Sequence, residues 1–104
     1  MSLRDVQEEV DKWASQFKIP YWTPHEQTLR LTEEVGELAR EVNHRWGPKK
    51  KKSTEDLKEL SEEMGDIIFT LACLANAQKI DLDESFKHAM DKCYGRDKDR
   101  YEKK

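Results

Sequence analysis

Apolar residues recur along this chain at alternating steps of three and four, which is the period of an amphipathic α-helix. The first such stripe predicts a helix that ends before Ile19-Pro20. The members of this stripe are Leu3, Val6, Val10, Trp13 and Phe17. A second helix should begin at Thr23-Pro24-His25-Glu26, because this segment has the form of a capping box with proline at the first helical position.

The second helix should run for about twenty residues and stop at Gly47-Pro48. Its apolar stripe consists of Leu31, Val35, Leu38, Val42 and Trp46. The run Lys49–Lys52 follows and is expected to form a solvated loop, with a basic flap beside an anionic ligand as the alternative.

A third helix should open at Ser53 or Thr54, which are good capping residues in front of two acids. Its second half, residues 67–77, is apolar on almost every side and therefore needs partners on every side. Three short companion helices hardly supply them, so this segment predicts a subunit interface. A fourth helix is capped at Asp81, and the charged tail at residues 97–104 is expected to fray.

No segment shows the sustained period-two alternation of a strand. The sequence thus predicts an all-α fold, a four-helix bundle formed by one domain over residues 1–104. We expect its core to be completed by oligomerisation, as a homodimer or a homotetramer.

Composition excludes several classes of function. The net charge is −3 and the isoelectric point about 5.6, which gives no general attraction to nucleic acid or to an anionic membrane. The longest apolar run, residues 67–75, is far shorter than the roughly 20 residues that a bilayer span needs. The first ten residues lack the apolar segment of a secretory signal, and the two cysteines have no metal-ligand spacing. We expect a cytoplasmic protein.

One pattern of eight residues occurs twice, in the second and third predicted helices. LTEEVGEL begins at Leu31 and LSEEMGDI begins at Leu60, so the residue class agrees at all eight positions. Each copy contains a glycine, Gly36 or Gly65, in a helix interior, where glycine costs roughly 0.8–1 kcal/mol relative to alanine. We expect that cost to be offset by the close approach of a second helix or of a ligand.

The acids of each copy form a pair on one helix face. At 100° per residue, Glu34 and Glu37 lie about 60° apart, and Glu63 and Asp66 share this relation. A short loop should make the two helices antiparallel neighbours, so that the two pairs face each other. A single Glu-x-x-Glu is usually solvated surface, but two copies with matching glycines favour a metal site.

Oxygen ligands without cysteine or histidine select hard cations such as Mg²⁺, with Mn²⁺ as a substitute. Converging carboxylates repel one another unless such a cation binds. Magnesium's preference for phosphate oxygens points to a nucleotide or another polyphosphate, and its activation of bound water points to hydrolysis.

At this pair of octets the sequence resembles the MazG family of all-α nucleoside triphosphate pyrophosphohydrolases, in its short single-domain, YpjD-like branch. The family pattern is Glu-Glu-x-x-Glu followed by Glu-x-x-Asp. Residues 33–37 match the first part, residues 63–66 match the second, and the resemblance extends over about residues 20–98.

The resemblance implies that water attacks the α-phosphate of a (deoxy)nucleoside triphosphate, giving the monophosphate and pyrophosphate with Mg²⁺ as cofactor. The metal ligands that it implies are Glu34, Glu37, Glu63 and Asp66. It also implies supporting acids, which would bind a further metal or orient water, at Glu33 and Glu62.

Two cations near the C-terminus also match the family, in which a lysine and an arginine four residues later contact phosphates. Here they are Lys92 and Arg96, and the alternative is a pair of surface cations near a helix end. Cys73 and Met90 stand where many relatives carry asparagine, so preference for a base or sugar cannot be transferred from the family.

Three aromatic or ring side chains at the ends of the second helix are candidates for stacking on a nucleobase: Trp22, His25 and Trp46. Packing at the helix ends is the equally good alternative.

Two other functions compete with hydrolysis. Glu41 and His44 have the Glu-x-x-His spacing of di-iron bundles, but those sites need a second such motif, which the chain lacks. The other alternative is a non-catalytic helical module that dimerises or senses nucleotides and retains the acidic site.

Overall fold

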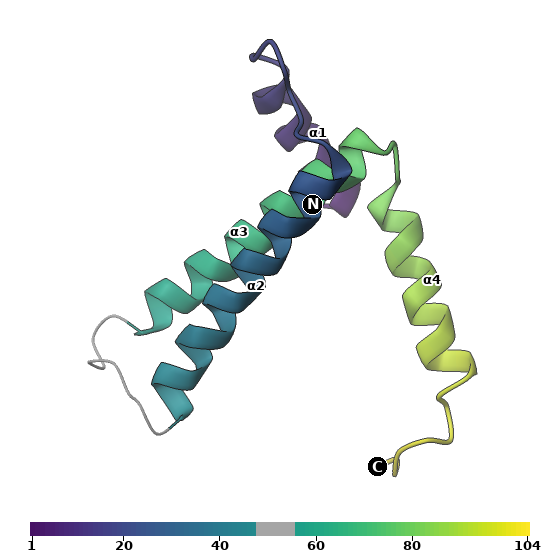
Figure 1. Ribbon diagram of the computed structural model, residues 1–104. Helices are drawn as coiled ribbons and strands as arrows, with labels where there is room; N and C mark the ends of the chain where they lie inside the picture. The colour runs from purple at the N-terminus through teal and green to yellow at the C-terminus, as the bar shows by residue number, and fades with distance from the viewer. Residues whose placement is uncertain (48–55) are drawn as a thin grey trace.

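The computed structural model describes residues 1–47 and 56–104 of the chain, and the regular elements in these ranges are four helices (Figure 1). They are α1 (Leu3–Ala14), α2 (Pro24–Trp46), α3 (Asp56–Ala77) and α4 (Leu82–Gly95). No strand occurs in the described ranges, so the predicted all-α fold is confirmed. None of the described helices combines the length and the apolar character that a membrane span requires.

Side-chain caps define where these helices begin. Thr23 accepts a hydrogen bond from the backbone N–H of Glu26, while the Glu26 carboxylate accepts from the N–H of Thr23, which completes the predicted capping box. Asp81 accepts from the N–H of Asp83 and caps α4 as expected. The predicted caps at Ser53 and Thr54, together with the lysine run, lie outside the described residues.

The first helix ends earlier than its apolar stripe predicts. α1 stops at Ala14, because the next N–H groups turn back to carbonyls only three residues away: Gln16 to Trp13 and Phe17 to Ala14. The side chain of Gln16 also donates to the Trp13 carbonyl, at 3.1 Å. Phe17 therefore leaves the helical stripe but keeps an edge-to-face contact with Trp13, at 4.9 Å between ring centroids.

Helices α2 and α3 lie side by side and antiparallel, forming a hairpin that is the most extensive contact in the molecule (Figure 1). α1 packs on the C-terminal part of α3. α4 packs on α1 and runs away from the hairpin, with the C-terminus beyond it. One end of the hairpin is therefore covered by α1, while its length is open.

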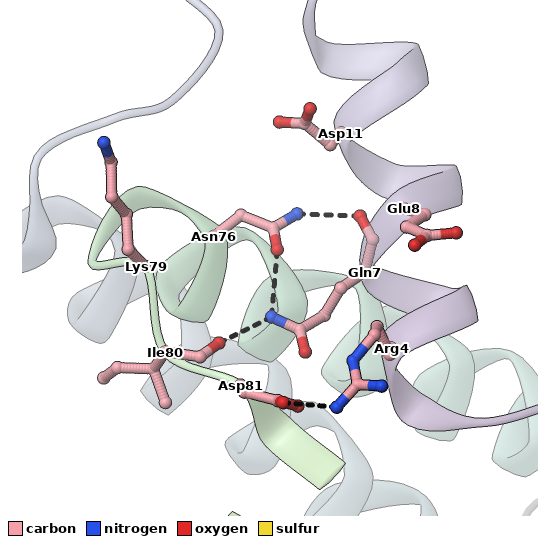
Figure 2. Close-up of a pocket in the computed structure, with 8 residues that line it drawn as sticks. All are labelled: Arg4, Gln7, Glu8, Asp11, Asn76, Lys79, Ile80 and Asp81. Atoms are coloured by element: carbon pink, nitrogen blue, oxygen red, sulfur yellow. Dashed lines mark hydrogen bonds and ion pairs between the residues drawn. The ribbon is translucent and has the colours of Figure 1, made fainter. Parts of the chain in front are cut away.

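A polar network fixes α1 to the corner between α3 and α4 (Figure 2). The side-chain nitrogen of Gln7 donates to Asn76 at 3.0 Å and to the carbonyl of Ile80 at 2.7 Å, and its oxygen accepts from the N–H of Leu82. The Asn76 amide returns a bond to the Gln7 carbonyl. Every polar atom of the buried Gln7 side chain is thus paired, which locks the angle of α1.

The core of a single chain is small. Among the described residues its buried apolar members are Val10, Ala14, Ala72, Cys73 and Ala75. The radius of gyration is 16.9 Å, compared with about 13 Å for a compact domain of 100 residues. Large apolar side chains remain exposed along the hairpin, including Val35 and Val42 on α2 and Met64, Ile68 and Leu71 on α3. The hairpin therefore presents apolar surface that this chain alone leaves uncovered.

Candidate functional site

Three carboxylates from the two facing helices meet in the middle of the hairpin. Glu34 and Glu37 come from α2 and Glu63 comes from α3, and one oxygen of each lies within 4.8 Å of the others. The antiparallel packing of α2 on α3 brings them together, because the two octets meet side by side. Within the described residues this group contains oxygen ligands only and no histidine.

Two oxygens in this cluster are buried without a partner. They are Oε2 of Glu34 and Oε2 of Glu63, neither of which accepts a hydrogen bond within the part of the chain that the structure describes. A buried polar group left unsatisfied costs about 1–3 kcal/mol, and more when it carries charge. Both oxygens are acceptors in a cluster of acids, so a hard cation such as Mg²⁺ or Mn²⁺ fits the donor set.

The pKa of Glu63 reflects this shortage of positive charge. Burial raises it to about 7, assisted by hydrogen bonding with and repulsion by the Glu37 carboxylate, and by the charges of Asp66 and Glu34. Near neutral pH the cluster therefore holds a proton part of the time, which a bound cation would displace.

The remaining acids of the octets lie at the rim. Asp66 is exposed and outside the group of three, but its charge acts on both Glu63 and Arg30, which places it beside the cluster. Glu33 and Glu62 are exposed on α2 and α3. The structure thus brings together three of the four expected ligands, with the fourth at the edge.

Arg30 is a site residue that the sequence analysis missed. Its Nε atom donates to Oε1 of Glu34 at 2.7 Å, so one oxygen of this buried carboxylate is paired and the other is free. The pair was detectable in the sequence, because Arg30 stands four residues before Glu34 and such residues are neighbours on a helix. The acidic cluster therefore has a fixed cation at its border.

An aromatic cavity adjoins the cluster on the side of α1. It has a volume of about 270 Å³ and is lined by Trp13, Pro20, Trp22, Gln27, Arg30, Phe69, Thr70 and Cys73. The guanidinium of Arg30 lies 5.8 Å from the centre of the Trp22 ring, within cation–π range. Because Arg30 lines the cavity and also contacts Glu34, the cavity and the carboxylates are adjacent.

The connector that carries Trp22 is tied to the neighbouring helices through Tyr21. The Tyr21 hydroxyl donates to Asp11 on α1 at 2.5 Å and accepts from Asn76 on α3 at 3.1 Å. Burial raises the pKa of Tyr21 to about 12, and the hydrogen bond to Asp11 acts in the same direction. The hydroxyl thus keeps its proton, and the tie holds at any physiological pH.

The other two stacking candidates lie elsewhere. His25 is exposed in the first turn of α2 and does not line the aromatic cavity. Trp46 is 64% exposed at the opposite end of α2, where it borders a groove with Val35 and Val42. A helix of 23 residues is about 34 Å long, so Trp22 and Trp46 of one chain cannot contact the same base.

The two C-terminal cations lie one turn apart, as the sequence indicates, since the N–H of Arg96 donates to the carbonyl of Lys92. They lie at the end of α4, which diverges from the hairpin (Figure 1). Within one chain the structure therefore separates Lys92 and Arg96 from the carboxylate cluster.

The glycines of the octets are not explained by the contact between α2 and α3. A methyl group added at Gly36 or Gly65 would meet nothing within 4 Å beyond its own helix. The expected close approach of a second helix is therefore absent among the described residues, which favours a ligand or a second copy as the reason for these glycines.

Comparison with known proteins agrees with the geometry. The sequence profile of the MazG nucleotide pyrophosphohydrolase domain matches residues 22–101. The chain is 52% identical over 103 residues to the uncharacterised protein YpjD of Bacillus subtilis strain 168, covering 99% of this chain and 93% of that protein.

Two crystal structures are similar over most of the chain. That of Bacillus subtilis YpjD gives a TM-score of 0.82 at 52% identity, covering 88% of this chain and 94% of that one. The Bacillus-conserved MazG protein, a nucleotide pyrophosphohydrolase, gives 0.79 at 43% identity, covering 95% and 96%. With its hairpin of paired acidic octets, this chain belongs to the MazG nucleotide pyrophosphohydrolase family.

Proposed function

We propose that this protein hydrolyses (deoxy)nucleoside triphosphates to the monophosphate and pyrophosphate, with Mg²⁺ as cofactor and Mn²⁺ as a substitute. The observation that carries the proposal is the meeting of Glu34, Glu37 and Glu63 with two buried oxygens unpaired. Three converging carboxylates, two of which each have one buried oxygen without a partner among the described residues, are suited to a divalent cation. Membership of a family of nucleotide pyrophosphohydrolases supports a nucleoside triphosphate as the substrate.

In this proposal Glu34, Glu37 and Glu63 hold the metal, and the rim carboxylate of Asp66 is the fourth ligand. When bound, the metal draws in phosphate oxygens and lowers the pKa of a coordinated water. Glu33 and Glu62, exposed beside the cluster, orient the attacking water or accept its proton. Arg30 holds the Glu34 carboxylate in place through its 2.7 Å bond.

In this proposal the base and the phosphates of the nucleotide bind at different parts of the site. Trp22 supplies an aromatic wall for the base in the cavity beside Arg30, as expected for a stacking residue. Lys92 and Arg96 contact the phosphates from the α4 of a second copy, because their own α4 diverges from the cluster. The protein therefore acts as a homo-oligomer, and the exposed apolar side chains of α2 and α3 form its interface.

The test of catalysis is the release of pyrophosphate from a panel of deoxynucleoside and ribonucleoside triphosphates, with Mg²⁺ and then with EDTA. Turnover should require the metal and should fall at least 100-fold in Glu37→Gln and in Asp66→Asn, because each change removes a proposed ligand. Glu9→Gln, an exposed acid on α1, is the matched control and should keep full activity. A folded wild-type protein that is silent across the panel would refute the proposal.

The test of assembly is the mass in solution by analytical ultracentrifugation. Wild type should sediment as a dimer or tetramer, and Ile68→Glu should dissociate it, because Ile68 is half exposed on the apolar face of α3. A wild-type monomer with full activity would show that Lys92 and Arg96 do not act across subunits.

A further inference from the structure

Four polar side chains line one face of α2, at steps of three, four and three residues: Gln27, Arg30, Glu34 and Glu37. Residues with this spacing stack along a helix. Glu34 and Glu37 belong to the carboxylate cluster, and Arg30 joins that cluster to the aromatic cavity. Gln27 therefore continues the row into the cavity itself.

Gln27 is largely buried, with 6% of its surface exposed, and its carboxamide makes no hydrogen bond among the described residues. Its amide atoms are not among the enclosed atoms that lack a partner, so they remain open to the cavity that Gln27 lines. Its backbone N–H is satisfied by the carbonyl of Thr23, so only the side chain is left open. Gln7 offers a direct contrast, since it is buried to a similar degree and every polar atom of its side chain is paired. An amide that is open to a cavity and has no partner among the described residues is available to a ligand that enters the cavity.

The residues around Gln27 indicate which kind of ligand the cavity binds. Trp13 and Phe69 form an edge-to-face aromatic wall, with ring centroids 5.7 Å apart, and Trp22 lines the cavity as well. The volume of about 270 Å³ is near the lower limit for ligand pockets, which suits one planar heterocycle with its sugar and phosphates outside. Aromatic walls with a few polar groups are the usual environment of a base recognised by stacking and by its edge.

We propose that Gln27 is the residue that determines base specificity, through hydrogen bonds from its carboxamide to the edge of a nucleobase held in the aromatic cavity. This inference rests on the proposed hydrolysis of nucleoside triphosphates. The carboxamide offers an acceptor and two donors, and so pairs with a base edge that carries a donor and an acceptor side by side. Seven residues of helix place Glu34 about 10 Å further along the axis, where the phosphates would follow.

The experiment measures kcat/KM for dATP, dGTP, dCTP, dTTP and dUTP with Mg²⁺ in the full-length protein. Gln27→Leu should lower kcat/KM for the best nucleotide by about 10- to 100-fold, mainly through KM, and should narrow the spread across the panel by a similar factor. Gln27→Glu should shift the ranking toward bases with an exocyclic amino group, because a carboxylate only accepts hydrogen bonds. Gln78→Leu, an exposed glutamine at the end of α3, should leave the ranking unchanged.

A second measurement is independent of catalysis. Without nucleotide, Gln27→Leu should keep the melting temperature nearly unchanged, because the carboxamide makes no hydrogen bond among the described residues and faces the cavity. A fall of several degrees would show that the amide has a structural partner and would overturn the proposal. If Gln27→Leu still hydrolysed the nucleotides with an unchanged ranking of bases, the role of Gln27 would be refuted and the proposed function would stand. If the wild type hydrolysed none of the five nucleotides, the proposed function itself would be refuted.

Discussion

Arg30 and Glu34, one turn apart on α2, form an ion pair of 2.7 Å in which the two partners meet very different environments. The arginine side chain is 45% exposed, while the glutamate side chain is 6% exposed. Only one oxygen of Glu34 takes part, and the other is buried and unpaired. The pair therefore neutralises the carboxylate partly and leaves room for a second positive charge.

Removing the arginine should destabilise the metal-free protein. Arg30→Gln leaves the buried Glu34 without its cation, and we expect a loss of about 1–2 kcal/mol in the free energy of unfolding, measured with urea in EDTA. The control is Lys87→Gln, which breaks an i,i+4 pair with Asp91 whose side chains are both mainly exposed. That change should stay within about 0.5 kcal/mol, and equal effects of the two variants would contradict the difference in burial.

Stability should depend on pH through Glu63. In metal-free protein the folded state holds the Glu63 proton up to about pH 7, whereas the unfolded chain releases it near its ordinary pKa of 4.5. The folded state therefore binds more protons in this window, and the free energy of unfolding should fall as the pH rises from about 4.5 to 7.

The measurement is urea unfolding at pH 5 and at pH 8, both in EDTA. Glu63→Gln should remove most of this contribution and be more stable than wild type at pH 8, while Glu62→Gln, an exposed neighbour, should keep it. Saturating Mg²⁺ should reverse the order at pH 8, because only wild type gains from a metal that binds the folded state. An unchanged pH dependence in Glu63→Gln would show that another group is responsible.

Substitution of Gly36 should affect the stability of a single chain and the activity or association of the protein in opposite directions. None of the described glycines has a positive φ, and a methyl group at Gly36 meets open space, so Gly36→Ala should add about 0.5–1 kcal/mol to the stability of a single chain. If a ligand or a second copy occupies that space, the same change should lower kcat/KM or weaken association.

Gly95→Ala is the matched control, because Gly95 also faces open space but lies at the end of α4. It should stabilise the chain and leave kinetics and sedimentation unchanged. Full activity and normal association in Gly36→Ala would mean that the glycine of the octet is dispensable.

The corner network should be strongly sensitive to loss of Gln7. Gln7→Leu leaves the Ile80 carbonyl, the Leu82 N–H and the side-chain oxygen of Asn76 without their partner, and we expect about 2–4 kcal/mol of destabilisation by thermal or urea unfolding. Gln16→Leu removes one exposed bond to the Trp13 carbonyl and should change stability by less than about 0.5 kcal/mol. Comparable effects of the two substitutions would show that the network contributes little.

Local signals predicted the elements well. The capping box at Thr23 and the cap at Asp81 act within a few residues, and the structure shows both. The meeting of Glu34, Glu37 and Glu63 followed from helix periodicity and from a short connection that makes two helices antiparallel. These inferences needed no knowledge of the remaining packing.

Features that depend on the geometry of a local turn or on tertiary contacts were not predictable in this way. The stripe through Phe17 indicated a longer first helix, but local hydrogen bonds to Trp13 and Ala14 turn the chain earlier. The aromatic cavity is lined by residues from α1, the connector, α2 and α3. The sequence around Gln27 therefore does not indicate which residues lie beside its side chain. The path of α4 away from the hairpin, which decides where Lys92 lies, is set by packing on α1.

The tie between Tyr21, Asp11 and Asn76 joins α1 to the rest of the molecule. The family match over residues 22–101 includes the acidic hairpin but leaves out α1, which contributes Trp13 to the cavity wall and Asp11 to the tie. The carboxylates thus lie in the segment that the family profile matches, while one wall of the cavity comes from a helix outside that segment. Substitutions that tilt α1 would change the opening of the cavity without altering a single carboxylate, so the two features can vary separately.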